Sequence, residues 1–132
     1  MSDTGRPRGA KRTRILVADD DPTVLDLMTE ILSRTGCEVV TEAKGDGAIA
    51  RVKEQPFDLV FLDIRMPISG LTAVEQILRL RPNTKIVMIT GEKDLSQSEK
   101  AIALGARMVL MKPFSVSVAL DTTEMLLAET GR

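Results

Sequence analysis

Short apolar runs alternate with amphipathic stretches along the chain from Arg14 onward. The runs are rich in Val, Ile, Leu and Met, and they predict strands at 15–18, 37–40, 59–62, 85–89 and 108–111. Four of the five are almost continuously apolar, which is typical of strands that are covered on both faces of a sheet. The pattern therefore favours a buried parallel sheet over an exposed antiparallel one.

The stretch after the first predicted strand has the periodicity of an amphipathic helix. Its apolar positions recur at the spacing of one helical face, which predicts a core-facing stripe; they are Val24, Leu27, Met28, Ile31 and Leu32. Asp21 is expected to cap this helix, with Pro22 in its first turn. Gly36 is expected to end it.

Four more helices fill the remaining gaps. The second is expected at about 46–55, where Pro56 stops it, and the third is expected to end before Pro82. Apolar spacing marks the third helix at Leu71, Val74, Ile77 and Leu78. The fourth covers 95–104, closed by Gly105, and the fifth covers 116–128. Five strand–helix units of this length predict an α/β fold, a doubly wound parallel sheet with five helices on both faces.

Charge divides the chain into a tail and a folded part. The 132 residues suit one domain and carry a net charge of −1. Residues 1–14 hold five basic side chains against Asp3, a net of +4, which leaves −5 for residues 15–132. We expect a disordered basic tail at 1–12 and one domain at 13–130. A role in solubility, or as a leader, is favoured for the tail over a contact with nucleic acid or a membrane.

The composition removes several kinds of chemistry. The chain has no histidine, which excludes His-based metal sites and Ser–His or Cys–His catalysis. Its single cysteine, Cys37, cannot form an internal disulfide, which fits a reducing cytoplasm. No apolar run has the length of a membrane span. We therefore expect a cytoplasmic protein that does not enter the membrane.

Polar residues follow four of the five predicted strands. The first strand is followed by Asp19-Asp20-Asp21, the third by Asp63, the fourth by Thr90-Gly91 and the fifth by Lys112-Pro113. The carboxyl ends of parallel strands share one edge of the sheet, where ligands bind. Each residue alone has a simpler explanation, such as a helix cap for Asp21 or a solvated strand end for Lys112.

Considered together, the acids require a counter-ion. Asp19, Asp20 and Asp63 would repel one another and resist joint ionisation. A hard divalent cation resolves this repulsion, and oxygen ligands without histidine or paired cysteine favour Mg²⁺ over zinc.

Four sequence blocks, in order and at matching spacing, resemble the signature blocks of receiver domains of two-component response regulators. They lie at 15–22, 58–67 and 86–91, and from Gly105-Ala106 to Lys112-Pro113-Phe114. The resemblance covers residues 14–129. It implies a flavodoxin-like sheet with the strand order 2-1-3-4-5.

The resemblance also implies a role for each residue at the strand ends. Asp63 is the expected phosphoacceptor. Asp20, Asp63 and the main-chain carbonyl of Arg65 are expected to bind Mg²⁺ directly, and Asp19 through a water. Lys112 and Thr90 are expected to contact phosphoryl oxygens.

The expected donor is a sensor histidine kinase, a phosphotransfer protein or a small molecule such as acetyl phosphate. The expected reader is a downstream protein, or a homodimer formed on phosphorylation. On this interpretation the chain is no enzyme beyond its own phosphorylation and dephosphorylation. Direct nucleic-acid binding is not expected.

Two departures from the family pattern bear on these expectations. Many receivers carry Tyr or Phe three residues before the lysine, where this chain has Val109. Because this aromatic is absent, we hypothesise that Thr90 acts through the loop after the fourth strand. The turn at 68–70 is one residue shorter than the common pattern, but it lies beyond Arg65, so we expect the metal ligands to be kept.

Three alternatives remain open at this point. The first is a pseudo-receiver that binds partners without phosphorylation. The second is a Mg²⁺-dependent phosphohydrolase, which usually needs an acid just after the nucleophile, where Ile64 and Arg65 stand. The third is the receiver part of a longer DNA-binding response regulator. Because the sequence ends with the last predicted helix, a stand-alone receiver is expected instead.

Overall fold

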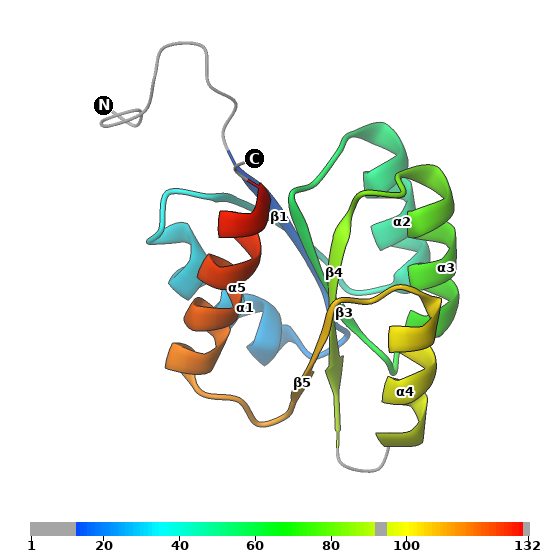
Figure 1. Cartoon of the computed structure of the whole chain (residues 1–132). Coiled ribbons are helices and arrows are strands. Elements are labelled where there is room, and N and C mark those ends of the chain that lie inside the picture. The colour runs from blue at the N-terminus through cyan, green and yellow to red at the C-terminus, as the bar shows by residue number, and fades with distance from the viewer. Residues whose placement is uncertain (1–12, 92–94, 131–132) are drawn as a thin grey trace.

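A five-stranded parallel sheet forms the centre of the computed structural model, which describes residues 13–91 and 95–130. The strands lie in the order β2-β1-β3-β4-β5 (Figure 1). The strands are β1 (Arg14–Ala18), β2 (Glu38–Glu42), β3 (Leu59–Asp63), β4 (Lys85–Thr90) and β5 (Met108–Met111). The helices are α1 (Pro22–Ser33), α2 (Gly45–Glu54), α3 (Gly70–Leu80), α4 (Leu95–Leu104) and α5 (Val116–Thr130).

The predicted fold class and strand order are confirmed. Every predicted strand and helix is present, with ends that shift by one or two residues. The expected tail at 1–12 lies outside the described residues. None of the helices in the described parts of the chain has the length and hydropathy of a membrane span.

Two apolar layers hold the helices onto the sheet. α1 and α5 cover one face, and α2, α3 and α4 cover the other (Figure 1). Because side chains alternate along a strand, β3 contributes to both layers: Phe61 packs toward α1 and α5, whereas Val60 and Leu62 pack toward the other three helices. All five residues of β3 are buried, which explains their almost continuous apolar sequence.

Strand β2 lies at one edge of the sheet and differs from the central strands. All of its residues are half-buried. Two ion pairs involve its terminal acids: Arg14 Nε lies 3.1 Å from Glu38 Oε1, and Arg51 Nε lies 2.6 Å from Glu42 Oε2. The polar ends of β2 are thus tied to β1 and to α2.

The predicted helix ends are confirmed where the structure describes them. Asp21 caps α1 by accepting a hydrogen bond from Thr23 N at 2.9 Å. Gly36 after α1 has a φ of 88° and Gly105 after α4 has a φ of 123°, a region that favours glycine at helix ends.

The prediction for Leu27 was wrong. Leu27 was expected in the core-facing stripe of α1, but it is 37% exposed. The buried face is centred on Met28, and the preceding position is rotated about 100° away from it. Leu25 packs against the core instead.

Candidate functional site

The four strand ends singled out in the sequence meet at one edge of the sheet. Asp19 directly follows β1, Asp63 ends β3, Thr90 ends β4, and Lys112 directly follows β5. Since the strands are parallel, all four positions lie at the carboxyl-terminal edge. The β1–β3 and β3–β4 pairings then bring Asp19 and Thr90 to either side of Asp63.

Three carboxylates form a cluster at this edge. Asp19, Asp20 and Asp63 each offer an oxygen atom, and these atoms lie within 4.8 Å of one another. Asp19 is completely buried and Asp63 is 5% exposed, whereas Asp20 is open to solvent. The acids predicted to share a cation are therefore neighbours.

Lys112 reaches into this cluster from the end of β5. Its Nζ atom lies 2.9 Å from Asp19 Oδ2 and 3.4 Å from Asp63 Oδ2. Burial lowers the pKa of Lys112, but the carboxylates of Asp19 and Asp63 outweigh it and leave that pKa above its usual value. Lys112 is thus a fixed positive charge beside the two buried acids.

The environment of Asp63 disfavours its charged form. Burial, followed by the negative charge of Asp19, raises the pKa of Asp63 to about 6. Two contacts act in the opposite direction: Arg65 N donates to Asp63 Oδ1 at 3.2 Å, and the Lys112 ammonium lies nearby. Asp63 consequently titrates in mild acid, near pH 6.

The donor atoms of the cluster fit a hard divalent cation. Asp19 Oδ1 accepts a hydrogen bond from Asp21 N at 2.9 Å. Asp19 Oδ2 is buried and receives no well-oriented hydrogen bond from a described residue, although the Lys112 ammonium is close. Three acids against one lysine leave negative charge uncompensated, and an oxygen-only donor set suits Mg²⁺. The part expected of the Arg65 carbonyl stays a prediction.

Thr90 and Val109, the two residues of the predicted readout, lie on the neighbouring strands β4 and β5. Thr90 is completely buried, and its hydroxyl donates to Gly91 O at 3.1 Å. Lys112 N donates to Thr90 O at 2.7 Å, which ties the ends of β4 and β5 together. Val109 opposes Met88 in the sheet and packs with the core under α3 and α4. The loop at 92–94, expected to carry the signal, lies outside the described residues.

One contact at this edge was not predicted from the sequence. Gly70 N, at the start of α3, donates to Ile64 O at 2.9 Å, next to Asp63. The sequence shows a turn at 68–70 that is one residue shorter than the family pattern, which by itself does not predict this contact. A glycine that opens a helix soon after a strand end was the available signal for a close approach of main chains.

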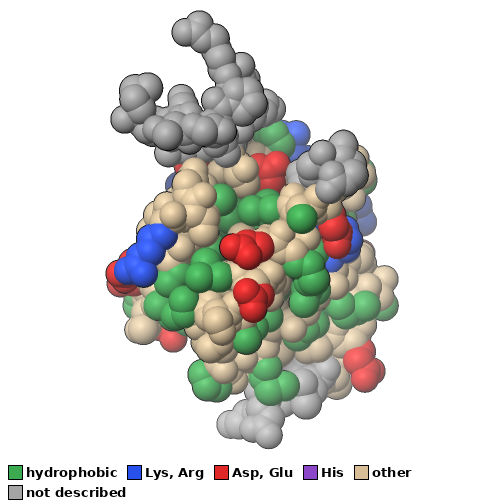
Figure 2. Space-filling model, turned by 60° about the vertical axis from the view of Figure 1, so that its left-hand side comes forward, with side chains coloured by type: hydrophobic (Ala, Val, Ile, Leu, Met, Phe, Trp, Pro, Cys, Tyr) green, Lys and Arg blue, Asp and Glu red, His purple; other side chains and the backbone are tan. Residues whose placement is uncertain are grey.

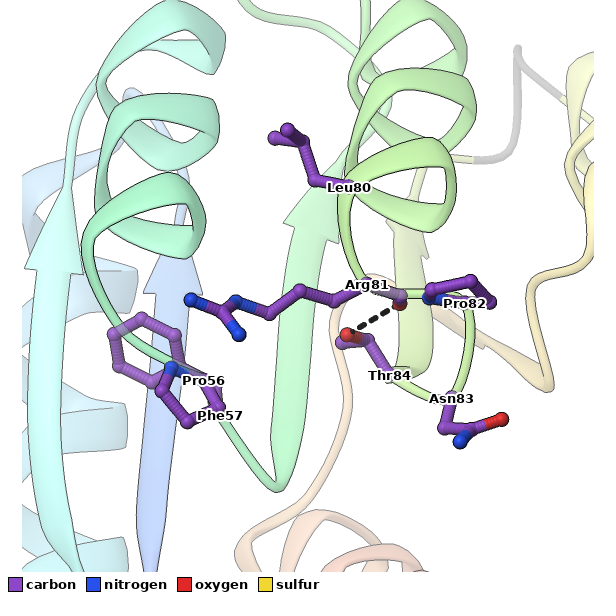
Figure 3. Close-up of a pocket in the computed structure, with 7 residues that line it drawn as sticks. All are labelled: Pro56, Phe57, Leu80, Arg81, Pro82, Asn83 and Thr84. Atoms are coloured by element: carbon purple, nitrogen blue, oxygen red, sulfur yellow. Dashed lines mark hydrogen bonds between the residues drawn. The ribbon is translucent and has the colours of Figure 1, made fainter.

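A surface pocket of about 340 Å³ lies at the opposite edge of the sheet, between the starts of β3 and β4 (Figure 3). Arg81 extends across it toward the end of α2, where its Nε donates to Val52 O at 2.6 Å. The Thr84 hydroxyl donates to Arg81 O at 2.9 Å. Arg81 therefore serves as a cap for α2, and the pocket contains none of the predicted site residues.

Comparison with known proteins identifies the family. The family described as "Response regulator receiver domain" matches residues 15–124. "Chemotaxis protein CheY" of Bacillus subtilis is 36% identical over 110 residues, which cover 82% of this chain and 92% of that protein. "Transcriptional regulatory protein ZraR" of Salmonella typhimurium is 32% identical over 117 residues, 88% of this chain but 26% of that protein.

A solved structure agrees closely in fold. The CheY-like receiver domain protein from Methanospirillum hungatei superposes with a TM-score of 0.86 at 32% identity, covering 90% of this chain and 96% of that one. The fold and the acidic edge define a signalling module of the two-component type. The chain belongs to the response regulator receiver domain family.

Proposed function

We propose that this chain is a phosphoacceptor switch whose phosphoryl group is carried on Asp63. The observation that carries the proposal is the setting of this carboxylate. It is almost completely buried at a strand end, beside two other acids and 3.4 Å from the Lys112 ammonium. A scaffold needs no such concentration of like charge, whereas phosphoryl transfer to a carboxylate uses both a cation site and a lysine.

The chemistry follows from these groups. An ionised Asp63 oxygen attacks the phosphorus of a phosphohistidine, the P–N bond breaks, and its electron pair leaves with the imidazole, giving an aspartyl phosphate. A pKa of about 6 leaves Asp63 largely ionised at neutral pH. On this proposal Lys112, whose Nζ lies 3.4 Å from Asp63 Oδ2, would contact one phosphoryl oxygen. Thr90 would contact another after its hydroxyl leaves Gly91 O.

Asp20, Asp63 and the Arg65 carbonyl would hold Mg²⁺, with Asp19 acting through a water. The bound ion supplies positive charge to the phosphoryl oxygens as they transfer. Asp19 then has a second task, because its buried Oδ2 keeps Lys112 beside Asp63. The donor would be a sensor histidine kinase, a phosphotransfer protein or acetyl phosphate.

Exposed apolar side chains on α4, β5 and α5 suit a protein reader. We call Ile102, Met111 and Met125 the α4–β5–α5 surface; they are 46%, 43% and 49% exposed. Phosphorylation adds charge at the carboxyl-terminal edge where β4 and β5 end, so a shift there would reach this surface. The reader would be a downstream protein or a second phosphorylated copy.

Nucleic acid is not the proposed partner. Figure 2, in which the side carrying α1 and α5 is turned forward, shows apolar and acidic side chains with few basic ones. Asp26 and Glu30 of α1 and Asp121 and Glu124 of α5 are exposed there. Such a face would repel phosphate backbones. Cys37, which forms no disulfide, is in keeping with the cytoplasm as the proposed compartment.

Two other functions have specific observations in their favour. Val109 in place of an aromatic residue favours a pseudo-receiver that works without phosphorylation. ZraR, of which the match covers 26%, favours a receiver that belongs to a longer regulator. The phosphoacceptor role would hold in that longer protein as well, since the site lies within residues 19–112.

Labelling with acetyl phosphate and Mg²⁺ tests the proposal. The unmodified protein is expected to gain the mass of one phosphoryl group, and Asp63→Asn is expected to gain none. Asp121→Asn removes an exposed carboxylate of α5 and is the matched control, expected to label normally. Equal labelling of Asp63→Asn would end the assignment, and no labelling of the unmodified protein would favour the pseudo-receiver.

A further inference from the structure

Gly70, the first residue of α3, lies directly against the main chain of the phosphoacceptor. Its N–H donates to Ile64 O at 2.9 Å. A Cβ atom on Gly70 would overlap with Asp63 O and lie only 2.8 Å from Ile64 Cα and 3.1 Å from the Asp63 carbonyl carbon. All three are main-chain atoms, so no side chain can rotate aside to make room. Position 70 therefore has space for hydrogen only.

Strand β4 holds the same piece of backbone from another direction. Asp63 opposes Ile89 in the β3–β4 register, and Ile64 N donates to Ile89 O at 3.0 Å. Asp63 and Ile64 are each 5% exposed. The peptide group that joins them is thus fixed by both β4 and α3.

We propose that Gly70 is a positioning residue for Asp63. The close approach of α3 sets where the Asp63 main chain lies, and through it where the carboxylate stands relative to Asp19 and Lys112. A methyl group at position 70 would have to push either α3 or Asp63 by about 1 Å. Displacements of that size at a reacting group are costly for binding and catalysis. The inference deepens the proposed function and rests on it only in taking Asp63 as the residue that is phosphorylated.

Gly70→Ala tests the inference, with Gly47→Ala as its matched control. Gly47 also lies in the first turn of a helix, but its added Cβ would meet the end of the Glu42 side chain. That side chain can rotate aside by loosening its ion pair with Arg51, so no main chain has to move. Both changes have a similar effect on helix propensity. By calorimetric titration, Gly70→Ala is expected to weaken Mg²⁺ binding about tenfold or more. Gly47→Ala is expected to stay within about twofold of the unmodified protein.

A kinetic measurement separates positioning from loss of fold. With saturating Mg²⁺, Gly70→Ala is expected to be phosphorylated by acetyl phosphate more slowly than Gly47→Ala. Both rates are measured well below the melting temperature of each variant, so that both proteins are folded. If Gly70→Ala binds Mg²⁺ as tightly as Gly47→Ala, the inference is overturned. If the unmodified protein binds Mg²⁺ but takes no label, the proposed function fails while the Mg²⁺ comparison still decides the role of Gly70.

Amide hydrogen exchange provides a second test that needs no variant. In the metal-free, unmodified protein the Gly70 amide is expected to exchange as slowly as the amides in the middle of β3. Exchange at the rate of an exposed loop would contradict a fixed contact, even if Gly70→Ala failed to fold.

Discussion

The ammonium of Lys112 lies 2.9 Å from Asp19 Oδ2, inside the carboxyl-terminal edge of the sheet. The same nitrogen is 3.4 Å from the Asp63 carboxylate, so one lysine bridges two buried acids. Leaving both acids without a positive partner would be strongly unfavourable, because each would be buried beside a like charge. Lys112 therefore acts as the counter-ion of both acids.

Replacing this lysine should make the thermal stability of the protein depend more strongly on Mg²⁺. We expect Lys112→Met to melt at a lower temperature than the unmodified protein in EDTA, because Asp19 and Asp63 lose their shared cation. The rise in melting temperature on adding Mg²⁺ is expected to be larger in Lys112→Met. Differential scanning calorimetry with and without Mg²⁺ measures both effects.

Lys85→Met is the control for this experiment. Lys85 begins β4 at the opposite edge, and its Nζ donates to Leu126 O at 3.2 Å. Its loss is expected to lower the melting temperature without changing the gain from Mg²⁺. Equal Mg²⁺ gains in the two variants would show that Lys112 does not act as a counter-ion.

The affinity for Mg²⁺ is expected to depend on pH through Asp63. A pKa of about 6 means that the metal-free protein holds a proton on this carboxylate in mild acid. The proton must leave before the cation binds, so the dissociation constant is expected to fall from about pH 5 to about pH 7 and then to level off. Calorimetric titration across this range, with Asp63→Asn for comparison, measures the effect. A flat profile would contradict it.

Stability without metal is expected to show the opposite trend. The ordinary pKa of an aspartate is 3.8, and folding raises the pKa of Asp63 to about 6. The protonated carboxyl therefore stabilises the folded state fully below about pH 4, and this stabilisation is lost as the pH rises to about 6. Asp63→Asn keeps the shape of the side chain and removes the charge. We expect it to be more stable by about 1–3 kcal/mol at neutral pH and equal near pH 4.

Urea unfolding in EDTA at several pH values measures this difference. Asp121→Asn, on the exposed side of α5, is expected to change stability little at any of these values. If Asp63→Asn had no greater free energy of unfolding than the unmodified protein at neutral pH, the view that the buried charge of Asp63 destabilises the fold would be disproved.

Arg81 offers a test in which the scaffold changes and the site does not. Its guanidinium caps the end of α2 through Val52 O at 2.6 Å, across the pocket of Figure 3. Arg81→Met is expected to lower the free energy of unfolding by about 1–2 kcal/mol and to leave Mg²⁺ affinity unchanged. Arg79→Met removes an exposed ion pair in which Arg79 lies 3.9 Å from Glu75, and it is expected to leave the free energy of unfolding almost unchanged. Urea unfolding would contradict this view of Arg81 if the two variants lost equal stability.

Much of this architecture could be predicted from the sequence, because its physical causes act locally. Continuous apolar runs such as 59–62 are characteristic of buried parallel strands, and Asp21 and Gly36 mark the ends of a helix without reference to distant residues. The meeting of Asp19, Asp63 and Lys112 also follows from topology, since parallel strands end at one edge.

The contacts that could not be predicted depend on how separate elements dock. Leu27 fits the apolar stripe of α1, but the sequence does not say which flank of the stripe meets the sheet. Arg81 and its partner Val52 are 29 residues apart, and no local pattern joins them. The approach of Gly70 to Asp63 is set by the docking of α3, which no periodicity reports.

The charged ends of β2 have a consequence for the behaviour of the protein in concentrated solution. An edge strand exposes hydrogen-bonding groups to which another polypeptide can add, the first step toward fibrils. Here an incoming strand would dehydrate the ion pairs of Glu38 and Glu42, and that cost opposes stacking. The charged ends of β2 thus oppose aggregation of the protein through this edge strand.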